Sequence, residues 1–274
     1  MRVRVERRRR LLLLAGAAFL VAAAGAVAVW AAASDEGEPT DLLPNLAQAA
    51  PDDLTGRTAK APGGSRFFLG FASAAANLGE GPLTVVGSRT PDRPTMKLHQ
   101  QVRRSDGSTR EVPLRSTMLY VRSPDHSHWH VLHFMRYELR AAAGGRVVRD
   151  QKTGFCLGDR YRVALTLPGR PPQPIYRDRC GKGSPGRLSM NEGISVGWGD
   201  NYQPHLEGQE LELTSLPAGR YVLVHRVNTT RDIVESDYDD NVASMAIDLS
   251  WPRGPKLPPS IDVIARCPGA ATCG

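Results

Sequence analysis

The sequence lacks two features that would place the protein in familiar classes. No long amphipathic helical pattern occurs after residue 33, which argues against a helical bundle. No basic run follows the first ten positions, and these carry six Arg and one Glu, so the net charge of +7 falls to +2 for the remaining chain. Nucleic acid is therefore not an expected partner, because its recognition needs a basic stripe on the folded part.

The chain begins with MRVRVERRRR, and an apolar run from Leu11 to Ala33 follows at once. A basic start, a long apolar stretch and small residues at 31–33 are typical of a signal peptide, yet the run is also long enough to span a bilayer as a helix. Both alternatives place the rest of the chain outside the cytoplasm. We expect an exported protein, secreted or membrane-anchored, that meets the membrane only through this segment.

Cysteine is scarce, with four residues at positions 156, 180, 267 and 273. In an exported protein they are expected to form two disulfides. Three pairings are possible, and we expect the nearest-neighbour one, Cys156 with Cys180 and Cys267 with Cys273. No cysteine lies close to the histidine cluster at 126–133, which argues against a closed, cysteine-rich zinc site.

Short β-type runs separated by Gly, Pro and Asp fill the chain from Arg66 onward. Several alternate apolar with polar residues, as in Gln209–Thr214 and Tyr221–Val227, which is typical of half-buried strands. We predict an all-β fold, a β-sandwich with long loops, preceded by an N-terminal hydrophobic helix. The expected parts are a signal peptide or anchor (1–33), a linker with a short docked piece near 42–46 (34–64), the sandwich domain (65–250) and a C-terminal tail (251–274).

Four of the seven histidines lie in DHSHWHVLHF, residues 125–134. His126, His128 and His130 are spaced by two, and on an extended strand such side chains point to one face at intervals of roughly 6–7 Å. Three neutral imidazoles on one face suit copper, zinc or iron, and copper(II) binds most tightly. Packing alone explains the pattern less well, because each buried ring would need a partner. We predict a metal site with these three ligands.

With this strand identified, the chain resembles the lysyl oxidase family, the copper-dependent amine oxidases of the extracellular space. Any one matching segment would be a weak signal, but five occur in the family's order. They are GFASAAANLGEGPL (70–83), HSHWHVLHFMRYEL (126–139), QKTGFCLGD (151–159), GISVGWGDNYQ (193–203) and LPAGRYVLVHRVNTTRDIVESDYDDNV (216–242).

The resemblance implies that His126, His128 and His130 bind copper, and that Lys152 and Tyr202 stand at the family's cofactor lysine and tyrosine. In that family the two side chains become a cross-linked lysine tyrosylquinone. The chain has only five lysines, so a lysine at the required place is a specific signal. The chain departs from the animal enzymes by having fewer cysteines. Asp125 stands where those enzymes have a cysteine, and Arg136 stands about where they have a further histidine.

The predicted activity is oxidation of primary amines, peptidyl lysine or small amines, to aldehydes, with molecular oxygen as acceptor and release of hydrogen peroxide and ammonia. A quinone carbonyl condenses with a primary amine, and its ring then accepts electrons. The alternative is an extracellular copper-binding protein without the quinone or oxidase activity. A third reading is a structural adhesion domain without metal. The sequence does not identify the general base.

Two further motifs have simpler alternative explanations. Glu235, Asp237, Asp239 and Asp240 form an acidic turn that could bind calcium, although an exposed acidic turn is the more common explanation. Asn228-Thr229-Thr230 matches a glycosylation sequon, which has meaning only in a host that glycosylates.

Overall fold

A computed structural model of the chain describes residues 38–274 except 124–126 and 164–165. The chain divides into Met1–Pro39 and Thr40–Gly274, and the strands of the described residues belong to the second unit. The leader at 1–33, with its expected hydrophobic helix, lies outside the described residues. Within the described ranges no helix is long and apolar enough to cross a bilayer.

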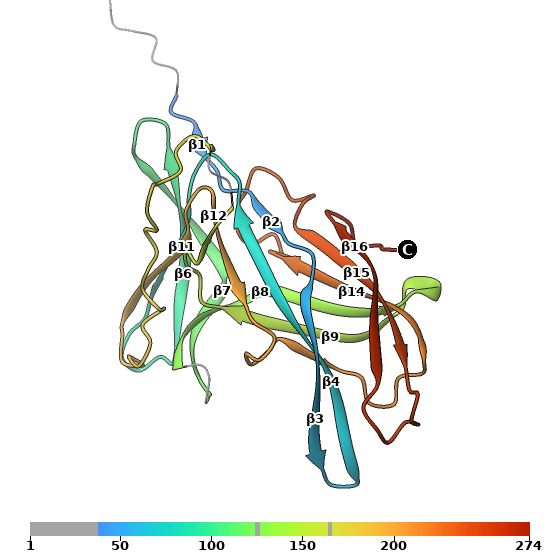
Figure 1. The fold of residues 1–274 in the computed structure, drawn as a ribbon. Coiled ribbons are helices and arrows are strands. Elements are labelled where there is room, and N and C mark those ends of the chain that lie inside the picture. Colours follow the sequence, from blue (N-terminus) through green and yellow to red (C-terminus); the bar gives the residue numbers. More distant parts are fainter. Residues whose placement is uncertain (1–37, 124–126, 164–165) are drawn as a thin grey trace, which may run out of the picture. The chain divides into compact units, whose positions relative to one another are not determined.

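Two antiparallel sheets make up the fold (Figure 1). The ten-stranded sheet follows the order β11 (Ser189–Ile194), β5 (Leu83–Ser88), β6 (Thr95–Arg104), β7 (Thr109–Arg122), β8 (Ser127–Ala141), β14 (Gly219–Val227), β15 (Val242–Ser250) and β16 (Ser260–Pro268), with β1 (Asp41–Leu42) beside β6 and β9 (Val147–Phe155) beside β8. The six-stranded sheet follows the order β10 (Tyr161–Arg162), β12 (Trp198–Tyr202), β4 (Gly64–Asn77) and β13 (Glu210–Glu212), with β2 (Leu46–Gln48) and β3 (Asp52–Ala61) also on β4. Among the described residues the one helical element is a 3-10 turn, η1 (Ala143–Gly145). The expected all-β class is confirmed.

The core includes apolar side chains from both sheets. On β4, Phe67, Leu69 and Phe71 are buried at every second position, as expected for a strand with one face inward. Across from them, Tyr137 of β8 is fully buried, and its ring centroid lies 4.8 Å from that of Phe71. Each such side chain contributes about 1.5–3 kcal/mol on burial, so this contact helps fix β8 relative to β4.

Segments expected to be linker and tail contribute strands. Strands β1, β2 and β3 lie within 34–64, and β16 lies within 251–274 and pairs with β15. Leu46 of β2 is fully buried, whereas β3 is largely exposed and forms with β4 a hairpin that extends away from the rest of its sheet (Figure 1). A polar composition therefore does not exclude a strand, because strands pair through backbone hydrogen bonds. An edge strand such as β3 can leave its side chains in water.

Both disulfides have the expected nearest-neighbour pairing, Cys156–Cys180 and Cys267–Cys273. Cys156 follows β9 directly, and Cys180 lies in the long connection between β10 and β11. This bond closes a separation of 24 residues, for which loop entropy predicts a stabilisation of about 3 kcal/mol. It also anchors the backbone that contacts Tyr202.

The acidic turn and the sequon have structural roles. The Glu235 carboxylate is buried and accepts hydrogen bonds from the backbone N–H of Leu46 (2.8 Å) and from the amides of Asn228 (2.6 Å) and Asn241 (2.5 Å). Burial raises the pKa of Glu235 to about 7. The carboxylate thus ties this turn to β2, and the buried Asn228 amide is inaccessible for glycosylation in the folded protein.

His225 on β14 is buried between the rings of Phe71 and Tyr137, with centroid distances of 4.7 and 4.5 Å. Neither ring nitrogen has a hydrogen-bond partner among the described residues. Burial lowers the pKa of His225 from 6.5 to about 3. The unfolded imidazole therefore binds a proton below about pH 6.5 while the folded one does not, so stability falls as the pH drops from 6.5 towards 3.

We expect His225→Leu to flatten this acid dependence. Between pH 7 and pH 4 the variant should lose about 3 kcal/mol less unfolding free energy than the wild type. Urea unfolding at the two pH values measures the difference. His205→Gln, a change at an exposed histidine, serves as the control and should keep the wild-type dependence. Equal acid dependence in His225→Leu and the wild type would contradict the prediction.

Candidate functional site

Strand β8 positions two of the three predicted metal ligands. His128 and His130 lie on one face, while Trp129 between them is buried in the core. The Nε2 atoms of the two histidines are 2.7 Å apart. His126 lies outside the described residues. Within the described ranges no group of three or more His, Cys, Asp or Glu side chains could hold a metal, so the trio stays a prediction.

The histidine pair points two ring nitrogens at one place, as ligands of a shared metal ion do. An ion about 2.0–2.1 Å from each imidazole nitrogen would hold the two nitrogens about 3.3 Å apart at the tetrahedral angle and about 2.9 Å apart at 90°. The Nε2 atoms are 2.7 Å apart, so they would separate by a few tenths of an ångström to hold an ion. Neutral imidazoles suit copper as well as zinc. A third His, Cys, Asp or Glu ligand would come from outside the described residues.

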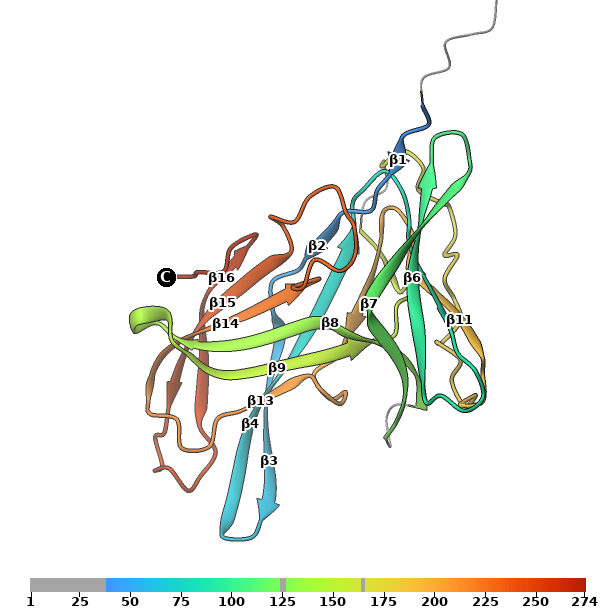
Figure 2. The same ribbon diagram turned by 180° about the vertical axis from the view of Figure 1, so that it is seen from behind.

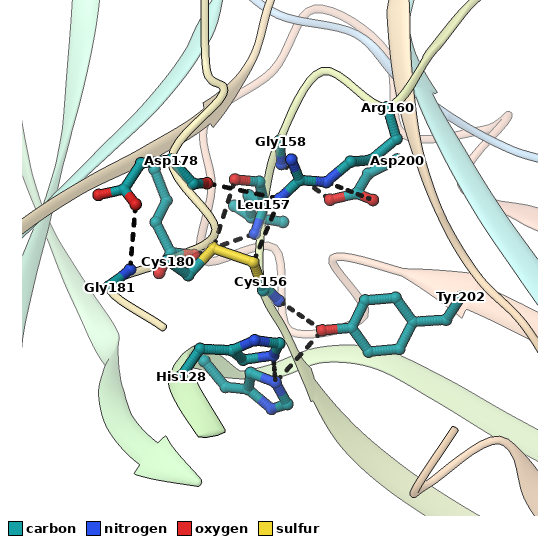
Figure 3. The surroundings of a disulfide bond; sticks show 12 residues. His128, Cys156, Leu157, Gly158, Arg160, Asp178, Cys180, Gly181, Asp200 and Tyr202 are labelled. Atoms are coloured by element: carbon teal, nitrogen blue, oxygen red, sulfur yellow. Dashed lines mark hydrogen bonds and ion pairs between the residues drawn. A yellow bond between two sulfur atoms is a disulfide. The ribbon is translucent and has the colours of Figure 1, made fainter. Parts of the chain in front are cut away.

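Tyr202 at the end of β12 lies beside this pair. Its phenol oxygen is 3.2 Å from Nε2 of His130 and accepts a hydrogen bond of 2.9 Å from the backbone N–H of Cys156 (Figure 3). Its ring stacks on Phe155, with centroids 3.8 Å apart and an interplanar angle of 18°. Burial raises the pKa of Tyr202 well above the ordinary tyrosine value. The phenol is therefore held neutral and in one orientation.

Lys152 lies on β9, which runs beside β8 as a long hairpin (Figure 2). Its exposed side chain lines a cavity of about 240 Å³ together with His130, Gly154 and Glu207. Tyr202 lines another cavity, of about 350 Å³, together with His128. His130 thus borders the cavity of Lys152, and His128 borders the cavity of Tyr202. The structure brings Tyr202 to the histidines and Lys152 to the cavity that His130 borders, but it does not place Lys152 and Tyr202 in one cavity.

Sequence reasoning missed the buried carboxylates beside Tyr202. Glu192 of β11 accepts a hydrogen bond of 3.0 Å from the N–H of Leu157, and Asp200 of β12 accepts one of 2.8 Å from the N–H of Gly158. Burial raises the pKa of Asp200 to about 7 and that of Glu192 well above its usual range. Asp200 also lines the Tyr202 cavity.

A carboxyl group with a pKa near 7 can accept and release a proton at neutral pH. Strand alternation could have placed Asp200 on the same face as Tyr202, since the two are separated by two positions. The burial that raises the pKa of Asp200 could not have been predicted from this spacing.

Comparison with known proteins gives one family. The family model described as lysyl oxidase matches residues 86–252. These residues include the histidine strand, Lys152 and Tyr202.

Individual relatives match shorter stretches. Lysyl oxidase homolog 2A of Danio rerio is 28% identical over 122 residues, which are 43% of this chain and 14% of that protein. Lysyl oxidase homolog 1 of Homo sapiens is 27% identical over 155 residues, 55% of this chain and 24% of that protein. Lysyl oxidase homolog 2 of Gallus gallus is 30% identical over 118 residues, 43% of this chain and 13% of that protein. The matched part spans less than a quarter of each of these relatives.

Proposed function

The chain belongs to the lysyl oxidase family, since the family model covers more than half of it, and from this premise we propose that it is an exported, copper-dependent amine oxidase. The proposed reaction converts primary amines, either peptidyl lysine or small amines, to aldehydes. Molecular oxygen is the electron acceptor, water supplies the oxygen atom of the aldehyde, and hydrogen peroxide and ammonia are the other products.

One contact carries the proposal: the phenol oxygen of Tyr202 lies 3.2 Å from Nε2 of His130, which in turn lies 2.7 Å from Nε2 of His128. In this proposal the three histidines of the 126–130 segment hold copper, and Lys152 and Tyr202 supply the quinone. Once formed, the quinone provides an electrophilic carbonyl and an electron sink for amine oxidation.

The residues around Tyr202 orient the phenol and handle protons. The N–H of Cys156 fixes the phenol oxygen, and the stacked ring of Phe155 fixes the ring plane. The Cys156–Cys180 disulfide anchors this backbone. Asp200, in the same cavity and with a pKa of about 7, is the candidate to accept a proton from the substrate.

Aerobic loading of the purified chain with copper tests the proposal. We expect quinone absorbance, peroxide release on addition of primary amines, and a cross-linked peptide pair containing Lys152 and Tyr202 by mass spectrometry. Bound copper without absorbance, cross-link or peroxide would instead support an extracellular copper-binding protein without oxidase activity. That second function is favoured by the placement of Lys152 and Tyr202 in different cavities.

A further inference from the structure

A third cavity, of about 380 Å³, lies over β8 and β14 and shares no lining residue with the two cavities of the candidate site. Four arginines line it, Arg136 and Arg140 on β8, Arg226 on β14 and Arg231 in the loop that follows. We propose that this cavity, the arginine cavity, binds the sulfate or phosphate group of an anionic ligand.

Strand register concentrates positive charge beside this cavity. Arg136 lies directly opposite Arg226 on β14 and directly opposite Lys152 on β9, so three cations form a row across three adjacent strands. Like charges directly opposite each other destabilise a sheet. Guanidinium groups cannot escape this repulsion by losing a proton. Counter-charges are therefore needed.

Two carboxylates supply only part of the counter-charge: Glu138, which lines the cavity, and Asp150, which lies opposite Glu138 on β9. The buried Glu138 accepts a hydrogen bond of 2.5 Å from Arg140 and lies 3.2 Å from Nη2 of Arg136 and 3.6 Å from Nε of Arg226. Asp150 accepts two hydrogen bonds from Arg136, of 2.9 and 2.8 Å. Four guanidiniums and Lys152 against these two carboxylates leave three positive charges, of which a dianion would balance two.

The arginines are also prepared for a ligand. The side chains of Arg136, Arg140 and Arg226 are only 31%, 25% and 28% exposed, so water screens their charges less than at an open surface. Arg231 is held over the ring of Tyr238, 4.8 Å from its centroid. Guanidinium groups donate forked hydrogen bonds that match the oxygen geometry of phosphate and sulfate. A concave basic site of this kind concentrates anions.

Calorimetric titration of the full chain with sodium sulfate, at an ionic strength held constant with sodium chloride, tests the site. We expect saturable binding of one sulfate and at least a tenfold weaker affinity in Arg231→Gln. This substitution removes no ion pair to Glu138, so the fold should survive, and the thermal midpoint checks that it does. Arg220→Gln is the matched control, because Arg220 lies on β14 but pairs with Asp248 outside the cavity. Its affinity should equal that of the wild type.

A sulfated oligosaccharide in place of the salt distinguishes the source of the group. If the oligosaccharide binds at least tenfold more tightly than inorganic sulfate, and this binding is lost in Arg231→Gln, the ligand of the cavity is a sulfated polymer. If the oligosaccharide and inorganic sulfate bind with equal affinity, the ligand is a free ion. Either result supports the site. Non-saturable uptake of both probes, or the same affinity in Arg231→Gln as in the wild type, overturns it. Binding needs no copper or quinone, so the outcome is separate from that of the oxidase test.

Discussion

Copper-loaded Tyr202→Phe should release no peroxide from primary amines, with turnover at least about a thousandfold below wild type. The substitution removes the phenol oxygen that lies 3.2 Å from His130 and from which the proposed quinone would be built. It also leaves the N–H of Cys156 without its acceptor, which costs about 1–3 kcal/mol of stability. Urea unfolding must therefore accompany the peroxide assay, so that lost activity is separated from lost fold.

Lys152→Arg should abolish the activity equally while leaving stability within about 0.5 kcal/mol of wild type. The exposed side chain keeps its charge but loses the primary amine that could bond to the Tyr202 ring. Lys182→Arg is the matched control, because Lys182 lines the cavity of Tyr202 itself. Full activity and quinone absorbance in Lys152→Arg would remove Lys152 from the cofactor, and loss in Lys182→Arg instead would transfer that role to Lys182.

Removing one histidine of the pair should abolish stable copper binding. His128→Ala deletes a nitrogen 2.7 Å from Nε2 of His130, and we expect affinity to fall by more than about a hundredfold, since even substitutions behind a metal ligand cost 10–100-fold. Elemental analysis after dialysis gives the stoichiometry, and copper titration gives the affinity. His126→Ala tests the ligand outside the described residues in the same way.

His133→Ala provides the control for copper binding. His133 lies on the same strand but is exposed, and its backbone φ of 60° interrupts the alternation of the strand. This variant should bind copper as the wild type does. Unchanged affinity in His128→Ala would show that the pair does not coordinate the metal, and the copper-dependent part of the proposal would be lost.

The all-β class and the disulfides could be predicted because local pattern and chain proximity control them. The alternation of apolar and polar residues in Tyr221–Val227 predicted strand β14, and the cysteines that are nearest along the chain form the two disulfides. Strands β1 to β3 and β16 lie in segments expected to be linker and tail, because their pairing depends on the backbone of β4, β6 and β15, which the local sequence does not indicate.

The buried carboxylates, one in the acidic turn and one in the candidate site, also could not be predicted from the sequence. Glu235 was expected in an exposed turn, yet it accepts hydrogen bonds from β2 and two asparagines. The pKa of Asp200 is raised to about 7 by the burial that the surrounding strands and loops create. Charge in a sequence indicates solvent exposure only on average, because hydrogen bonds from distant segments can satisfy a buried carboxylate.

The spacing of the histidines by itself determined that His128 and His130 share a face, because side chains on a strand repeat every two residues. Only the tertiary structure decided that Tyr202, 72 residues after His130, lies within 3.2 Å of it, and that four arginines from β8, β14 and a loop line one cavity. The physical reason is range: strand periodicity acts between neighbours in the chain, whereas contacts between strands depend on register and on the packing of the sheets.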